Sequence, residues 1–267
     1  METPLKNLLK EKLVNGKTCF GAVMRLYAPE IVEMAGLAGC DFVVVDIEHE
    51  PFTVREAADL IRVSLLSGMT PIVRIGRASL HLIDPLLSAG AQGFNIARVK
   101  NAQDIDELVE TLFYHPYGNR TVYALGRSGN FGHGTDEAEW MEKVNSEIML
   151  GVIIEEAEAI GNLDAILTHP HLDFVDVGAK DLRQSMGMPP LSEINPIAAD
   201  VIRRTKAAGK FTGHSIHGHM PDEQTYGRLS DGKGVMLIAT PSGIIMSALA
   251  AQVAAAKKVA VTQEHAA

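Results

Sequence analysis

Eight short apolar runs alternate with eight helical patterns along the 267 residues of the chain, and this repeat constrains the fold more than any other feature. The strand-like runs cover residues 18–26, 41–49, 70–76, 93–99, 147–155, 172–179, 210–216 and 234–241. They are continuously apolar rather than alternating, which indicates strands that are buried on both faces. Eight such strand–helix units predict an α/β fold, a (β/α)8 TIM barrel whose active site lies at the carboxyl ends of the strands.

Helical patterns fill the gaps between these runs, and glycine often closes them. They cover residues 29–39, 53–68, 80–90, 101–114, 158–169, 195–209, 222–232 and 242–258. Glycines stand where helix C-caps belong, at Gly39, Gly68, Gly90 and Gly209. A doubly wound open sheet is the alternative fold, but the first strand–helix turn lacks the GxGxxG sequence typical of it.

We expect a single barrel domain over residues 1–267, with two segments that exceed the repeat. Residues 1–16 predict a short amphipathic helix that could plug the bottom of the barrel. Residues 114–146 form a long glycine-rich connection before the fifth strand, which could rim the active-site mouth or a subunit contact. Within this connection, Gly126–Gly134 lacks the lysine and Ser/Thr ending of a nucleotide loop, so we interpret it as a flexible loop.

Composition excludes several classes of function. The net charge is −9 without a basic block, which disfavours nucleic acid as a partner. No apolar run approaches the length of a membrane span, and the amino terminus has no secretory signal. We interpret Cys19 and Cys40 as buried small hydrophobes and expect a cytoplasmic protein. His214, His217 and His219 match no metal motif and could equally face solvent or a neighbouring subunit.

Acidic residues stand at the ends of two successive strands, Glu155 after the fifth and Asp181 after the sixth. The carboxyl ends of barrel strands surround one site, so these two carboxylates should converge. They would repel one another unless a cation lay between them, and oxygen ligands suit a hard divalent cation. The alternative is that one or both residues interact with the amino terminus of the following helix.

Two earlier strands also end in charged residues: Asp46, Glu48 and His49 follow the second strand, and Arg74 ends the third. Carboxylates raise the basicity of a neighbouring histidine and orient its ring, which makes His49 a candidate general base. A structural loop histidine is the alternative. Arg74 could form a salt bridge with Asp46 or Glu48, or could hold a substrate carbonyl or carboxylate.

Together these segments resemble the HpcH/HpaI aldolases, a family of metal-dependent class II pyruvate aldolases. The resemblance runs from about residue 6 to residue 258 and rests on VVVDIEHEPF, PIVRIG, LLSAGAQGF, YHPYGNR, VIIEEAEAIGNLDAIL and VDVGAKDL. It implies a (β/α)8 barrel that assembles as a homohexamer, often with the last helix, here residues 242–258, swapped between neighbours. It also implies cleavage of a 4-hydroxy-2-oxo acid into pyruvate and an aldehyde, with Mg²⁺, Mn²⁺ or Co²⁺ as cofactor.

The resemblance also implies roles for individual residues. Glu155 and Asp181 correspond to the family's metal ligands, and Arg74 to the arginine that holds the pyruvyl carbonyl oxygen. Gly178 and the backbone around Lys180 correspond to the turn whose N–H groups receive the pyruvate carboxylate at a helix amino terminus.

The acid–base residues follow the same correspondence. His49 matches the histidine of the acid–base machinery, and Asp46 matches the acidic residue that ends the same strand. Glu48 and Glu50 stand beside this histidine as further carboxylates. The family's aspartate that pairs with the base histidine is here Ser88, which adds no negative charge.

Other departures from the family pattern concern Arg98, Lys180 and Arg183, which add cationic character at or near the mouth. A cationic mouth favours an anionic substrate, such as a dicarboxylate or a phosphorylated aldehyde. A weakened base would still permit chemistry that needs only enolate stabilisation. A 2-oxo acid decarboxylase, a relative that forms carbon–carbon bonds and a non-catalytic 2-oxo acid binding barrel are therefore the alternatives.

Overall fold

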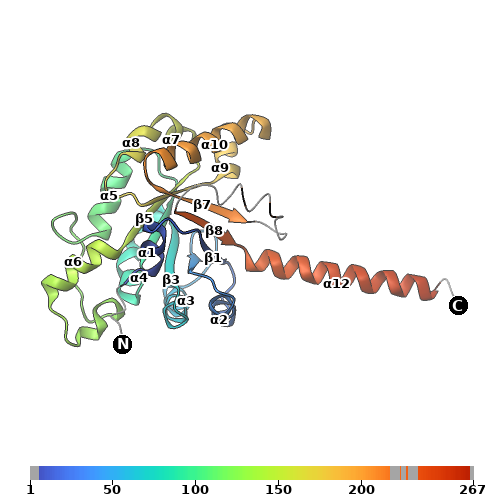
Figure 1. The fold of residues 1–267 in the computed structure, drawn as a ribbon, viewed down its shortest axis with the longest axis horizontal. Coiled ribbons are helices and arrows are strands. Elements are labelled where there is room, and N and C mark those ends of the chain that lie inside the picture. The colour runs from blue at the N-terminus through green and yellow to red at the C-terminus, as the bar shows by residue number, and fades with distance from the viewer. Residues whose placement is uncertain (1–5, 217–222, 224–226, 228–233, 265–267) are drawn as a thin grey trace.

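The computed structural model describes residues 6–216, 223, 227 and 234–264, and its eight parallel strands close into one barrel in chain order (Figure 1). The predicted (β/α)8 barrel is therefore confirmed. The strands are β1 (Cys19–Met24), β2 (Phe42–Asp46), β3 (Thr70–Gly76), β4 (Gly93–Ala97), β5 (Met149–Ile154), β6 (Phe174–Val177), β7 (Phe211–Ile216) and β8 (Val235–Ala239).

Helices surround the barrel and follow the predicted patterns with a few differences. They are α1 (Leu8–Val14), α2 (Pro29–Leu37), α3 (Val54–Leu66), α4 (Ile83–Ala89), α5 (Ala102–Leu112), α6 (Glu137–Glu147), α7 (Ala157–Gly161), α8 (Leu163–Leu167), α9 (Ala179–Ser185), α10 (Leu191–Ala207) and α12 (Pro241–Glu264), with short 3-10 helices η1 (Arg77–Leu82) and η2 (Arg127–Gly132). Two short helices, α7 and α8, replace the single helix predicted at 158–169, and α9 was not predicted at all. Most of the helix predicted at 222–232 lies outside the described residues.

The strands are largely apolar because each separates two layers of core. Phe42 and Val44 of β2 belong to a cluster inside the barrel, whereas Val43 and Val45 pack outward in the cluster beneath the helices. Successive side chains of a strand point to opposite faces, so burial of both faces demands a continuous apolar run. On each strand, one set of alternate side chains therefore points into the barrel, as Phe42 and Val44 do, and the other set points toward the helices.

Helix α1 closes the amino end of the barrel. Leu9 and Leu13 are buried within the interior cluster. Asn7 caps the helix by accepting the N–H of Lys10 at 3.0 Å, while its amide donates to the carbonyl oxygens of Gln92 at 3.0 Å and Glu147 at 2.9 Å. The capping residue thus also ties the plug to the segments that lead into β4 and β5.

Residues 114–146 lie at the amino end rather than at the mouth of their own barrel. The second half of this connection forms η2 and α6, and the indole N–H of Trp140 donates to the carbonyl of Ser128 at 2.9 Å. The last residue of α6, Glu147, accepts the backbone N–H of Asn7 at 2.7 Å, which sets the segment beside α1. The expectation that it could rim the active-site mouth is therefore wrong within one chain, because the connection leads into the start of β5.

Helix α12 leaves the barrel after β8 and runs away from it (Figure 1). Apolar side chains along it are exposed, namely Ile244, Ile245, Met246, Leu249 and Val253. No helix among the described residues is long and apolar enough to cross a membrane.

We predict that Gly151→Ala destabilises the barrel. A Cβ at this position in β5 would overlap the ring of Phe174, which is buried in the interior and cannot swing aside. Overpacking of this kind costs about 1–3 kcal/mol in the free energy of unfolding, to be measured by urea denaturation. Gly161→Ala is the matched control, since no atom lies within 4 Å of its Cβ position. Equal stability of the two variants would contradict the tight interior packing.

Candidate active site at the carboxyl ends of the strands

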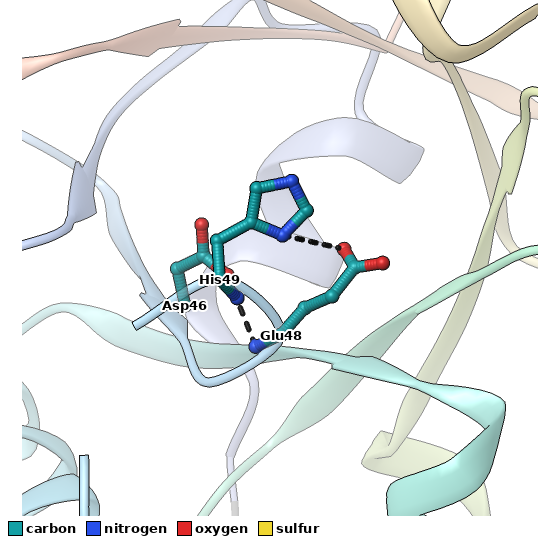
Figure 2. A group of neighbouring side chains, drawn as sticks. All are labelled: Asp46, Glu48 and His49. Atoms are coloured by element: carbon teal, nitrogen blue, oxygen red, sulfur yellow. Dashed lines mark hydrogen bonds and ion pairs between the residues drawn. The ribbon is translucent and has the colours of Figure 1, made fainter. Parts of the chain in front are cut away.

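Asp46 ends β2 and has no exposed surface. Its Oδ1 accepts the backbone N–H groups of Glu48 and His49 at 3.2 and 3.3 Å. These two bonds fold the chain over the carboxylate directly after the strand and set the positions from which the two side chains project (Figure 2). The cluster expected from the sequence is therefore formed around a buried acid.

Arg74 lies beside Asp46 because the two residues pair in the register of β2 and β3. Its Nη2 is 3.1 Å from Asp46 Oδ2, and its Nε is 3.1 Å from Glu48 Oε2. The structural salt bridges considered for Arg74 are thus present. A guanidinium carries five N–H donors, so these contacts leave donor capacity for the oxygen of a ligand.

His49 is the exposed member of the cluster, with 52% of its side chain accessible, and its Nδ1 lies 3.5 Å from Glu48 Oε2 (Figure 2). This distance exceeds that of a good hydrogen bond, so Glu48 does not hold the ring firmly. An exposed ring of this kind can approach a ligand in the mouth of the barrel.

Ser88 lies far from His49 within one chain. It belongs to the last turn of α4, which returns the chain from the carboxyl end of β3 to the amino end of β4. There it packs against Gly126, where an added Cβ would lie 2.7 Å from the Ser88 carbonyl oxygen. His49 follows β2 at the opposite end of the barrel. The pairing of Ser88 with His49 that the resemblance implies is therefore not made within a single chain.

Glu155 follows β5 and is 6% exposed. Its Oε1 accepts the backbone N–H of Arg98 at 2.9 Å, and a Cβ at Gly178 would lie 2.5 Å from its Oε2, so this glycine makes room for the carboxylate. Burial, followed by the negative charges of Glu48 and Asp181, raises the pKa of Glu155 to about 7. The carboxylates of Glu48, Glu155 and Asp181, from three different strand ends, therefore repel one another. The positive charge near Glu155 does not offset this repulsion and the burial.

The residues after β6 lie on the surface of the mouth. Asp181 and Lys180 are exposed in the first turn of α9, where a carboxylate also suits the helix dipole. Arg183 donates through Nε to the carbonyl of Pro189 at 2.7 Å, and the Nη1 of Arg98 lies 3.0 Å from the carboxylate of Glu156. Arg98 and Arg183 are therefore already paired, although both were expected, with Lys180, to make the mouth more positive.

Two groups of acids could hold a divalent cation. Among the described residues, Asp46, Glu48 and His49 offer three donor atoms within 4.8 Å of one another. Arg74 already neutralises both acids of this group, however, which weakens its attraction for a cation. Glu155 and Asp181 offer two carboxylates with less compensation, and Mg²⁺ commonly binds one or two carboxylates together with substrate and water. The donor set of Glu155 and Asp181 therefore fits a divalent cation better.

The sequence model of the HpcH/HpaI aldolase/citrate lyase family matches residues 22–228. The chain belongs to this family. Among curated relatives, the 2-keto-3-deoxy-L-rhamnonate aldolase of Escherichia coli (strain K12) is 32% identical over 217 residues, which are 80% of either chain. The hydroxypyruvate/pyruvate aldolase of Roseobacter denitrificans is 31% identical and covers 93% of this chain and 88% of its own. The HpcH/HpaI protein described here is accordingly an enzyme of the class II aldolase type, a carbon–carbon lyase.

A solved structure of the same fold extends the range of chemistry in these relatives. The crystal structure of citrate synthase SbnG superposes with a TM-score of 0.83 at 27% identity, covering 96% of this chain and 99% of that one.

Sequence reasoning did not single out Arg25, whose Nε lies 3.5 Å from Asp46 Oδ2. The available signal was the one that marked Arg74, a charged residue at the end of an apolar run. Of the three histidines in and directly after the seventh apolar run, only His214 is described, and burial lowers its pKa to about 4. His217 and His219 lie outside the described residues.

We predict a pH-dependent penalty from Glu155 in the cation-free protein. The unfolded chain ionises this carboxyl near 4.5, whereas the folded chain holds the proton up to about pH 7. The free energy of unfolding should therefore fall by about 1–3 kcal/mol as the pH rises from 4.5 to 7. Glu155→Gln should remove this fall, as measured by urea denaturation with a chelator at several pH values. Parallel pH profiles for the two proteins would contradict the raised pKa.

Proposed function

We propose that the protein cleaves a 4-hydroxy-2-oxo acid into pyruvate and an aldehyde. The observation that carries this proposal is the Glu155 carboxyl, buried beside two further acids at the end of a barrel in which Arg74 and His49 stand nearby. Membership of the HpcH/HpaI aldolase/citrate lyase family supports chemistry at a carbon–carbon bond. We assign the activity to the cytoplasm, since Cys19 and Cys40 are free thiols.

Glu155 and Asp181 are the proposed ligands of a divalent cation, with Mg²⁺, Mn²⁺ and Co²⁺ as the candidates. A cation bound there supplies Lewis-acid polarisation of the 2-oxo group. Gly178 supports this role because its missing side chain leaves the Glu155 carboxylate free to turn toward α9.

The remaining steps are assigned to side chains of this chain. Arg74, held by Asp46 and Glu48, orients the 2-oxo oxygen and stabilises the negative charge that develops on it. The first N–H groups of α9, between Gly178 and Lys180, receive the carboxylate of the pyruvyl group, because such groups have no acceptor within the helix. His49 accepts the proton of the 4-hydroxyl group, directly or through one water, as the carbon–carbon bond breaks.

The test is the release of pyruvate from a panel of 4-hydroxy-2-oxo acids, with and without Mg²⁺, Mn²⁺ or Co²⁺. Cation-dependent release from at least one member supports the proposal. Absence of release from every member at all three cations would overturn it.

A second candidate function is favoured by the similarity to citrate synthase SbnG. The same enolate chemistry could form a carbon–carbon bond or release CO₂ from a 2-oxo dicarboxylate. Oxaloacetate decarboxylation without any aldol cleavage would favour this candidate.

We further propose that the protein is a homo-oligomer, a hexamer by resemblance. The exposed apolar residues of α12, such as Ile245 and Leu249, support exchange of this helix with a neighbouring copy. Ser88 gives a second reason. Since it lies at the amino end of its own barrel, it can meet a His49 only in another copy.

We predict that Asp181→Asn weakens binding of the cation. The substitution removes one charged ligand, so the loss should exceed the roughly 10–100-fold typical of a change outside the ligand set. Titration calorimetry with Mn²⁺ measures it, and pyruvate release should fall in parallel. Asp200→Asn, at an exposed ion pair of α10, is the control. Full activity of chelator-treated Asp181→Asn protein would refute the assignment.

We predict that Arg74→Lys lowers kcat/KM about a hundredfold or more. Lysine keeps the charge but loses the planar fork, and loss of one such donor costs about 3 kcal/mol of transition-state stabilisation. Arg62→Lys, which alters an exposed pair with Asp59, is the matched control. If Arg74→Lys retained the parent kcat/KM, Arg74 would serve only as a salt-bridge partner of Asp46 and Glu48.

We predict that Ser88→Asp raises aldol cleavage relative to oxaloacetate decarboxylation. A carboxylate brought to His49 by a neighbouring copy would stabilise the protonated ring, and general-base effects reach about 10²–10⁴-fold. Both rates are compared at fixed cation in the assembled protein. An unchanged ratio, in an oligomer shown to bring residue 88 to His49, would mean that Ser88 does not limit the base.

A further inference from the structure

Arg25 points into the mouth of the barrel. It follows β1, and Val23, two residues earlier, belongs to the interior cluster, so both side chains lie on the inner face. Its Nε is buried within 3.5 Å of Asp46 Oδ2. The side chain as a whole keeps 32% of its surface exposed, so part of it remains accessible to a ligand.

The charge of Arg25 is only partly used by Asp46. The same Oδ2 atom receives the closer contact from Arg74 Nη2, at 3.1 Å. Arg25 Nε donates no hydrogen bond to any residue that the structure describes. A guanidinium with five donors and one long, shared ion pair has capacity left for another carboxylate.

Thr240 places a second donor on the inner face at the end of β8, the strand next to β1. It follows β8 on the face of Met236 and Ile238, which line the barrel interior. The register pairs Ala22 of β1 with Ala239 of β8, so Thr240 lies next to Val23. Its hydroxyl is buried and has no hydrogen-bond partner among the described residues. A buried hydroxyl of this kind calls for a ligand or water.

This pair of donors lies across the barrel from the proposed cation ligand Glu155. In a closed barrel of eight strands in chain order, β1 stands opposite β5. Two further cations near the mouth are engaged elsewhere, Arg98 with Glu156 and Arg183 with the carbonyl of Pro189. A 2-oxo acid whose pyruvyl end lies at Glu155 therefore directs its far end toward β1.

We propose that Arg25 and Thr240 form a subsite for a second carboxylate, so that the enzyme prefers 2-oxo dicarboxylates over 2-oxo monocarboxylates. The proposal deepens the proposed function and rests on it for the orientation of the 2-oxo group. Arg25 is then the residue that selects the substrate, and Asp46 holds it in position.

The test is binding of two five-carbon 2-oxo acids to the Mn²⁺-loaded protein by titration calorimetry. 2-Oxoglutarate carries a distal carboxylate, and 2-oxopentanoate carries a methyl group in its place. The parent should bind 2-oxoglutarate roughly 10–100-fold more tightly, since hydrogen bonds to a charged group have effects of this size. Arg25→Gln should lose most of this preference while binding 2-oxopentanoate as before. Arg203→Gln, which removes an arginine from the exposed face of α10, should keep it.

Arg25→Lys guards against a folding defect in Arg25→Gln, because it keeps a positive charge beside Asp46. Its preference should lie between those of the parent and Arg25→Gln. An equal preference in all three proteins would overturn the subsite, as would an equal loss of affinity for both ligands in the variants. Arg25 would then be only a charge partner of Asp46.

Binding does not require turnover, so the two proposals can fail separately. Selectivity that follows Arg25 without pyruvate release from any 4-hydroxy-2-oxo acid would overturn the aldolase proposal and support the subsite.

Discussion

A fully buried carboxylate, Asp46, organises the carboxyl end of the barrel. An unpaired carboxylate at such a depth would cost several kcal/mol, and each of its oxygen atoms meets a different part of the chain. Oδ1 accepts two N–H groups from the turn that carries Glu48 and His49, and Oδ2 forms ion pairs with Arg25 and Arg74. The ends of β1, β2 and β3 are therefore held together around one atom group.

Charge is divided across the mouth as a consequence. Arg25 and Arg74 belong to the sector from β1 to β3, whereas the poorly compensated acids Glu155 and Asp181 follow β5 and β6. Glu48 links the two sectors, since it contacts Arg74 and also raises the pKa of Glu155. An anionic ligand bridging a cation on one side and guanidinium groups on the other would meet positive charge at both ends.

The barrel could be predicted from the sequence because burial on both faces leaves a direct trace, as in the continuous run Phe42–Val45. Strand ends were predictable for the same reason, which is why Asp46, Arg74 and Glu155 stood out. Arg25 stands in the same kind of position, near the end of an apolar run, so its place at the mouth was open to the same prediction. Short α9 was hidden because seven residues carry too little periodicity to predict a helix.

The position of Ser88 illustrates a different limit. Its correspondence to a family aspartate is a matter of motif, but the end of the barrel on which it lies depends on the direction of α4. That direction follows from the parallel strands on either side, once the barrel itself is accepted. A contact between two copies of the chain, such as one between Ser88 and His49, cannot be predicted from the apolar pattern that predicts the strands.

Helix α1 closes the amino end of the barrel and leaves the carboxyl end as the open one. Leu9 and Leu13, with Phe42 and Phe174 above them, fill the amino end with apolar side chains. Among the parts that the structure describes, the open end is the one where the exposed ring of His49 and the first turn of α9 lie. Whatever binds deepest must arrive first and depart last, so the architecture imposes an order on ligand exchange before any chemistry takes place.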